Sequence, residues 1–219
     1  MHARPLLSTF TSLLALAWLS GCTSVPEALQ EPIPDYVPRN YTGAAVLPTT
    51  LGRVLLLPSA GSHVAPPEST AQIDPVFVTA LQRQQRFEVV TIDRNDSRRS
   101  YGAQEFLSTS SLPPGLLNRF AADFAADAVL FIDITSFRAH RPLELGVRCK
   151  LVVLKSREII WSFDEIFSLA DPTIDASARR HAKNSRTPVP VNLSANLSQS
   201  PTAFAAYVAE TIFSTLPPR

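Results

Sequence analysis

The sequence predicts an α+β fold: a single mixed sheet of about five strands, with helices packed on the sheet and a C-terminal helix. Two observations predict it. In the first half, short apolar runs alternate with a segment whose apolar residues recur at helical spacing, as in parallel strands joined by helices. In the second half, two alternating runs separated by Lys155-Ser156-Arg157 indicate an antiparallel hairpin. The predicted order is strand, helix, strand, helix, three strands and a helix.

Residues 53–92 predict the first strand-helix-strand unit. Arg53–Leu57 is an apolar run ended by a proline, which is typical of a buried strand. The helix that follows, which we expect to begin at Ser69 or Thr70, has an apolar stripe. This stripe consists of Ile73, Val76, Phe77, Ala80 and Leu81. Phe87–Ile92 returns to β-forming residues, and the polar segment 93–113 predicts a long loop with at most a turn of helix.

The next segments predict the second helix and the antiparallel strands. Pro114 suits the first position of a helix, because its missing N–H is not needed there. Ala128–Phe137 is the strongest strand pattern in the chain. Glu144–Leu154 and Glu158–Phe167 alternate between apolar and polar residues and form the predicted hairpin.

The C-terminal part completes one predicted domain over residues 52–216. Residues 171–185 form a polar helix that carries several basic residues, and 187–199 is of low complexity and reads as a flexible loop. Ser200-Pro201 then opens the last helix, with serine as the N-cap. The length of 52–216 suits a single domain.

The chain begins like a secreted protein. A short basic start precedes an apolar run from Leu6 to Leu19, which is too short to cross a bilayer as a mature helix. It ends in Leu19-Ser20-Gly21-Cys22, which resembles a bacterial lipobox. The resemblance implies that residues 1–21 are a lipoprotein signal peptide and that Cys22 becomes a diacylglycerol cysteine with further acylation such as palmitate. Several acyl chains make a permanent membrane anchor.

The residues around the predicted anchor indicate its location. Thr23 follows the cysteine where Asp would favour the inner membrane, so we expect the outer membrane, with the protein facing the periplasm. Residues 22–51 are rich in proline and predict an extended tether that is not needed for folding. We therefore expect the folded domain to begin near Gly52.

Composition and motifs exclude several classes of function. The formal net charge is +1, so no basic field favours nucleic acid. With Cys22 lipidated, Cys149 has no intrachain partner, and its apolar neighbours predict a buried small residue. Ser59 and His63 form the one Ser/His neighbourhood, without the strand-turn-helix setting of a nucleophile elbow. His140 and His181 lack metal-ligand spacing. We therefore predict no catalytic residues, no metal and no cofactor.

Two segments resemble a known periplasmic domain. These are "FAADFAADAVLFIDITSF", in which Ala126-Asp127 leads into a strand, and "VRCKLVVLKSREIIWSFDEIF", in which Arg157–Trp161 follows the hairpin turn. Over residues 52–167 the chain resembles the domain shared by curli secretion lipoproteins, the amino-terminal domain of TolB and LpoB-type activators of penicillin-binding proteins. Residues 137–143 are a short polar link where the curli proteins carry a transmembrane hairpin, so a secretion pore is not expected.

These patterns predict a non-catalytic lipoprotein that binds a protein or assists assembly in the cell envelope. The expected partners are the membrane, through Cys22, and an envelope protein, while an oligomer remains open. The expected contact is the edge of the terminal hairpin or the basic helix, at Arg179, Arg180, His181 and Lys183, which could also meet lipid headgroups. The alternative is a hydrolase or small-ligand-binding lipoprotein whose site is formed by loops 59–69 and 93–113.

Cys22→Ser should leave an unprocessed precursor of higher mass, because the thiol that receives the lipid is absent. Mass spectrometry of the membrane fraction checks this outcome. Cleavage of the variant after Gly21 would contradict the lipobox assignment.

Overall fold

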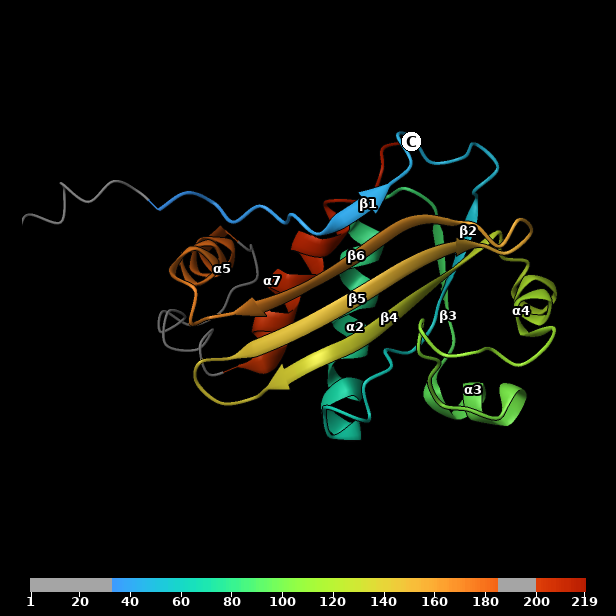
Figure 1. Ribbon diagram of the computed structural model, residues 1–219, viewed down its shortest axis with the longest axis horizontal. Helices are drawn as coiled ribbons and strands as arrows, with labels where there is room; N and C mark the ends of the chain where they lie inside the picture. Colours follow the sequence, from blue (N-terminus) through green and yellow to red (C-terminus); the bar gives the residue numbers. More distant parts are fainter. Residues whose placement is uncertain (1–32, 185–199) are drawn as a thin grey trace, which may run out of the picture. The chain divides into compact units, whose positions relative to one another are not determined.

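The computed structural model describes residues 33–184 and 200–219. The predicted signal peptide, Cys22 and the low-complexity segment 187–199 lie outside these residues. The described chain from Pro34 onward belongs to one compact unit (Figure 1).

The fold is a six-stranded mixed sheet with five helices in the described residues, so the predicted α+β class is confirmed with one strand more than expected. The strands are β1 Tyr41–Gly43, β2 Arg53–Leu56, β3 Glu88–Thr91, β4 Ala128–Arg138, β5 Glu144–Val153 and β6 Ile159–Ser168. The helices are α2 Pro67–Arg83, α3 Arg94–Tyr101, α4 Leu116–Phe124, α5 Pro172–Asn184 and α7 Pro201–Phe213. In the sheet order β1-β6-β5-β4-β2-β3, the strands β3, β2 and β4 are parallel, and the other pairs are antiparallel.

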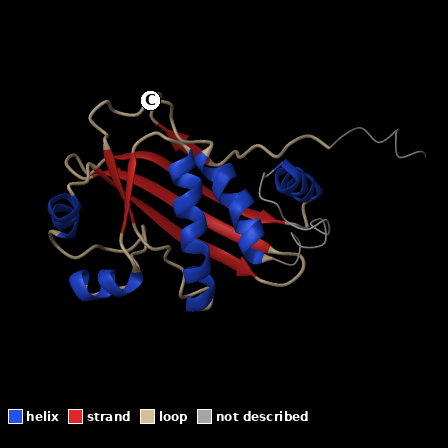
Figure 2. Ribbon diagram, turned by 180° about the vertical axis from the view of Figure 1, so that it is seen from behind, coloured by secondary structure: helices blue, strands red, loops and turns tan. Residues whose placement is uncertain are grey.

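The main core lies between one face of the sheet and the helices α2 and α7, which run side by side in Figure 2. Alternate residues of β4, β5 and β6 point into it, as the period of a strand requires. They include Ile132, Ile134, Val147, Cys149, Trp161 and Phe163. Cys149 is fully buried, which confirms the predicted role of a small core residue.

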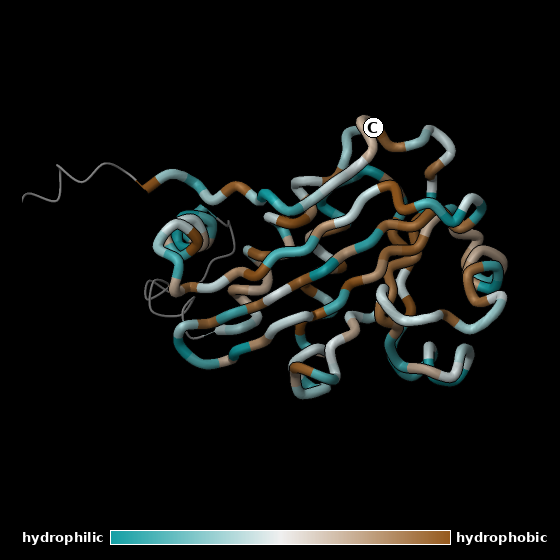
Figure 3. Tube along the Cα trace, viewed as in Figure 1, coloured by the Kyte–Doolittle hydropathy of each residue, from teal (hydrophilic) through white to brown (hydrophobic). Residues whose placement is uncertain are grey.

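The opposite face of the sheet is covered only in part. Leu55, Val129 and Phe131 pack against Phe106 and Phe120, so β2 and β4 are buried on both sides. Along β5 and β6 the hydropathy alternates (Figure 3), and their second face carries polar pairs such as Arg148 and Asp164, whose side chains lie 2.7 Å apart. This face reads as a half-solvated antiparallel sheet.

Three local predictions are corrected by backbone geometry. Helix α2 begins at Pro67, because Pro66 serves as its N-cap and proline fits the first turn. Helix α4 begins at Leu116 and not at Pro114, because Gly115 has a φ of 75°, outside the helical region. Segment 93–113 contains the helix α3, whose N-cap Asp93 accepts hydrogen bonds from two backbone N–H groups.

The tether predicted over residues 22–51 is corrected at its C-terminal end. Residues 41–43 form strand β1 and pair with β6, and Leu47 and Leu51 are buried. The Leu47 amide also donates to the Pro218 carbonyl, at 2.8 Å. The folded unit therefore begins before Gly52, because the extended backbone that proline favours also suits pairing along a sheet edge.

Gly146→Ala should lower the free energy of unfolding by about 1–3 kcal/mol. Gly146 faces a bulge between Ile134 and Ser136, where a Cβ would lie 2.5 Å from the Thr135 Oγ1 and 2.9 Å from the Ser136 N. Urea unfolding measures the change. Gly52→Ala is the control, because its Cβ would meet only the Asp127 Oδ2, at 3.4 Å; an equal loss in both variants would contradict the explanation.

Candidate functional site

The outer edge of β6 is covered by the N-terminal segment 34–44, which we call the strap. Ala44 N donates to Ile160 O at 2.9 Å, and Asp164 N donates to Asn40 O at 3.0 Å. The Glu165 carboxylate accepts hydrogen bonds from the backbone N–H groups of Arg39 and Asn40, at 2.5 and 2.8 Å. The hairpin edge predicted as a free binding edge is therefore largely occupied by the chain itself.

Tyr36 anchors the start of the strap. Its hydroxyl donates to Glu165 at 2.8 Å, its backbone N–H donates to the Ser177 hydroxyl at 2.6 Å, and its ring packs edge-on against Phe167. Burial, followed by the hydrogen bond to Glu165 and the charge of that carboxylate, raises the pKa of Tyr36. The phenol therefore stays protonated and keeps its role as a donor.

The basic residues of α5 lie beside the strap. Arg180 binds the Asp35 carboxylate at 2.7 Å and the Pro34 carbonyl at 3.0 Å. Arg179 pairs with Asp175 at 2.8 Å. His181 lies 3.3 Å from Glu210, and Lys183 is exposed near the end of the helix. Part of this predicted binding cluster thus holds the strap and the helix together. A contact with a partner or headgroups at α5 stays a prediction.

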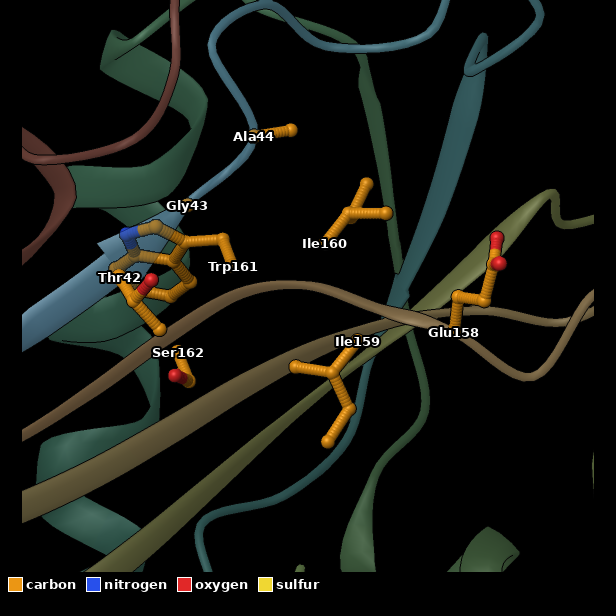
Figure 4. Close-up of a pocket in the computed structure, with 8 residues that line it drawn as sticks. All are labelled: Thr42, Gly43, Ala44, Glu158, Ile159, Ile160, Trp161 and Ser162. Atoms are coloured by element: carbon orange, nitrogen blue, oxygen red, sulfur yellow. The ribbon is translucent and has the colours of Figure 1, made fainter.

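A shallow groove opens where β1 ends beside the start of β6 (Figure 4). Its lining consists of Thr42, Gly43, Ala44, Glu158, Ile159, Ile160, Trp161 and Ser162. Ile159 is 54% exposed. Gly43 lies so close to the core that a Cβ would come within 3.2 Å of the Trp161 ring. The groove therefore combines an exposed apolar side chain with the end of a paired edge.

The two loops named for the alternative site meet beyond the C-terminal ends of β2 and β3, beside the middle of β4. The crossover through α2 lies on one face of the sheet and that through α4 on the other, so this is a topological switch point, where open α/β sheets commonly hold ligands. The sequence prediction that the loops 59–69 and 93–113 come together is therefore right in its geometry.

Arg94 is the centre of the polar network at this switch point. Its guanidinium binds Asp74 at 2.8 Å, Glu105 at 3.1 Å and the Ser59 carbonyl at 2.8 Å. The Ser59 hydroxyl donates to Asp74 at 2.6 Å, whereas His63 is exposed. Ser59 is thus bound to a carboxylate that also pairs with Arg94, and these contacts join the two loops to helix α2.

Glu105 accepts several hydrogen bonds from donors in the loop 59–69. Its carboxylate accepts hydrogen bonds from the Gly61 and Ser62 N–H groups and from the Ser62 hydroxyl, the last at 2.6 Å. Burial raises the pKa of Glu105, but these hydrogen bonds and the one from Arg94 outweigh burial, so the pKa lies below its ordinary value. The carboxylate fills a cradle of the kind that binds anions.

Asp133 holds the loop around Ser108 against the sheet. It is 1% exposed at the middle of β4 and accepts hydrogen bonds from the Ser108 N–H and hydroxyl, at 2.9 and 2.7 Å. Lys150 donates to the Ser108 carbonyl at 3.1 Å. Sequence reasoning missed Arg94, Glu105 and Asp133, although an aspartate inside the apolar run of β4 was a signal that a buried partner was needed.

Residues 33–184 and 200–219 contain no cluster of three or more His, Cys, Asp or Glu side chains that could hold a metal ion. Burial, followed by the charges of Asp133 and Asp164, raises the pKa of the Cys149 thiol. None of the helices in the same ranges combines the length and apolarity needed to cross a membrane.

No family model matches this chain, and no curated protein does so either. Solved structures with similar folds include the PelC dodecamer from Paraburkholderia phytofirmans, at 14% identity and a TM-score of 0.45, covering 80% of this chain and 96% of that one. Lipoprotein GNA1162 from Neisseria meningitidis has 13% identity and a TM-score of 0.42, covering 62% and 99%. The LpoB C-terminal domain from Escherichia coli has 15% identity and a TM-score of 0.35, covering 53% and 82%. TolB from Acinetobacter baumannii has 13% identity and a TM-score of 0.32, covering 71% of this chain and 33% of that one.

Glu105→Gln should destabilise the protein at pH 7 by about 1–3 kcal/mol, because the neutral amide loses charged hydrogen bonds to Ser62 and Arg94. The pKa of Glu105 is lower in the folded protein than in the unfolded chain, where it is near 4.5. Ionised Glu105 therefore stabilises the fold at pH values above 4.5, and this contribution is lost as the pH falls through the folded pKa. The difference between variant and wild type should therefore shrink in acid.

Chemical unfolding at pH 7 and below pH 4.5 measures this difference. Glu158→Gln is the control, because Glu158 is exposed and should change the stability little at either pH. A constant difference across this range would show that Glu105 does not act through its charge.

Proposed function

We propose that this protein is a lipid-anchored module of the bacterial envelope, facing the periplasm, that binds an extended segment of another envelope protein without catalysing a reaction. The observation that carries the proposal is the groove at the end of β1. There the ladder stops after the bond from Ala44 to Ile160, and Ile159 presents an exposed apolar side chain. A partner segment could continue the line of β1 and bury Ile159.

The hydrogen bonds among the side chains at the switch point support a binding role at the groove over the hydrolase or small-ligand alternative. Arg94, Glu105 and Asp133 are bound to groups of their own chain, as are Ser59 and Asp74. A ligand at this position would have to displace several charge-assisted hydrogen bonds, which are the stronger ones in proteins. The groove at the sheet edge requires no such displacement.

The location follows from the predicted acylation of Cys22, with the outer membrane favoured by Thr23. The eleven residues from Thr23 to Ile33 separate the anchor from the folded unit that begins at Pro34. A fully extended chain of this length spans about 40 Å. The module would thus act close to the membrane, on a partner in the same envelope compartment. Contacts of Arg179, Arg180, His181 and Lys183 with that partner or with headgroups form a second part of the proposal.

Photo-crosslinking amino acids at Thr42 and Ile159 should capture the same envelope protein in cells that express the full chain. Ile166 is the control, because it is similarly exposed on β6 but does not line the groove. Ile159→Asp should weaken binding of the captured protein about tenfold, since each factor of ten corresponds to about 1.4 kcal/mol.

Equal capture from Ile166, or unchanged binding by the Ile159→Asp variant, would remove the groove as the site. Turnover of a substrate that His63→Ala abolishes would replace the binding module by the enzyme alternative.

A further inference from the structure

From Pro34 onward, the exposed large apolar side chains of the described residues are concentrated at one edge of the sheet. They are Val37, Tyr41, Val46, Ile159 and Ile166. Three of them, Val37, Tyr41 and Val46, lie on the strap or directly after it, and two lie on β6, which the strap follows. Single exposed apolar residues are ordinary on a surface. Their restriction to the first described residues and the adjacent strand indicates a surface that meets another apolar phase.

The strap lies close in sequence to Cys22, and this position identifies the apolar phase as the bilayer. Cys22 precedes Pro34 by twelve residues, so the start of the strap lies within about 40 Å of an acylated Cys22 whatever the path between them. Once the acyl chains are in the bilayer, contact of the strap with the same bilayer is intramolecular. A short connection that can span the distance raises the effective concentration of the strap at the bilayer, so weak apolar contacts suffice.

The charges of the strap suit anionic headgroups. Arg39 is exposed between Val37 and Tyr41. The two nearby carboxylates are already engaged, Asp35 by Arg180 and Glu165 by the Tyr36 hydroxyl and two N–H groups of the strap. Their negative charge is therefore partly compensated, and the basic side chain of Arg39 is placed beside the apolar ones, as in surfaces that lie in the interface of a bilayer.

We propose that Val37, Tyr41 and Val46 insert at the interface of the membrane that holds the anchor, with Arg39 at the lipid phosphates. This inference rests on the proposed acylation of Cys22. The contact sets the orientation of the module, because the sheet edge at β1 then faces the lipid and the edge at β3 faces away. The groove at Ile159 would lie close to the bilayer, so its partner would be a protein that exposes an extended segment near the membrane.

The test uses the full chain, processed and lipidated in cells and reconstituted into vesicles of phosphatidylethanolamine and phosphatidylglycerol with brominated acyl chains. Val37→Trp and Tyr41→Trp introduce a reporter on the strap. Gln104→Trp is the matched control, at an exposed position after α3. The native Trp161 is fully buried and provides a constant background. Thermal melting confirms that each variant retains the fold.

The expected result is a blue shift and loss of emission for the Val37→Trp and Tyr41→Trp variants in brominated vesicles, with no change for the Gln104→Trp variant. Vesicle flotation separates the two proposals. If the protein floats but the strap reporters are not quenched more than the control, the membrane contact is overturned and the anchor stands. If the protein does not float, the anchor fails, and the membrane contact fails with it. Crosslinking of Val37 to a protein or a second copy would also overturn the contact.

Discussion

Burial of β4 on both faces is the constraint on which the rest of the structure depends. This strand pairs parallel to β2 and antiparallel to β5, and every residue from Ala128 to Ile134 is buried. Asp127 fixes its start, since the carboxylate accepts hydrogen bonds from the N–H groups of Gly52 and Arg53, at 2.8 and 2.9 Å. Both faces of a strand so apolar must be covered, and α2 and α7 on one side and α4 on the other meet this requirement.

The polar network at the switch point is a consequence of the same strand. Asp133 is buried at the middle of β4, and a buried carboxylate without partners would cost several kcal/mol. The loop around Ser108 supplies those partners, and the neighbouring loop is held by Arg94 and Glu105. The two loops at the switch point are thereby held together by side chains of the chain itself. In this protein the loops at the switch point thus stabilise the fold, at a position where other open α/β sheets commonly bind ligands.

The antiparallel part of the sheet has an edge strand, β6, whose backbone groups need partners. β6 would be a long edge strand with free backbone groups, which promote association with other chains. The strap covers the middle of that edge and leaves the groove at Ile159, so that the open part is short and defined. Because Asp35 and Tyr36 bind α5 and β6, the start of the strap is fixed to the rest of the folded unit.

The sequence by itself determined the features that depend on local pattern. Alternation over Glu144–Phe167 predicted the hairpin, Ser200-Pro201 predicted the start of α7, and the apolar run at Ala128 predicted β4. These patterns arise because each element buries one of its own faces. Only the tertiary structure decided that the strap pairs with β6, that Arg180 binds Asp35 across 145 positions, and that Arg94 joins Asp74 to Glu105. A three-residue edge strand and isolated charged side chains have no periodicity, so their partners are chosen by the positions that the packed sheet gives them.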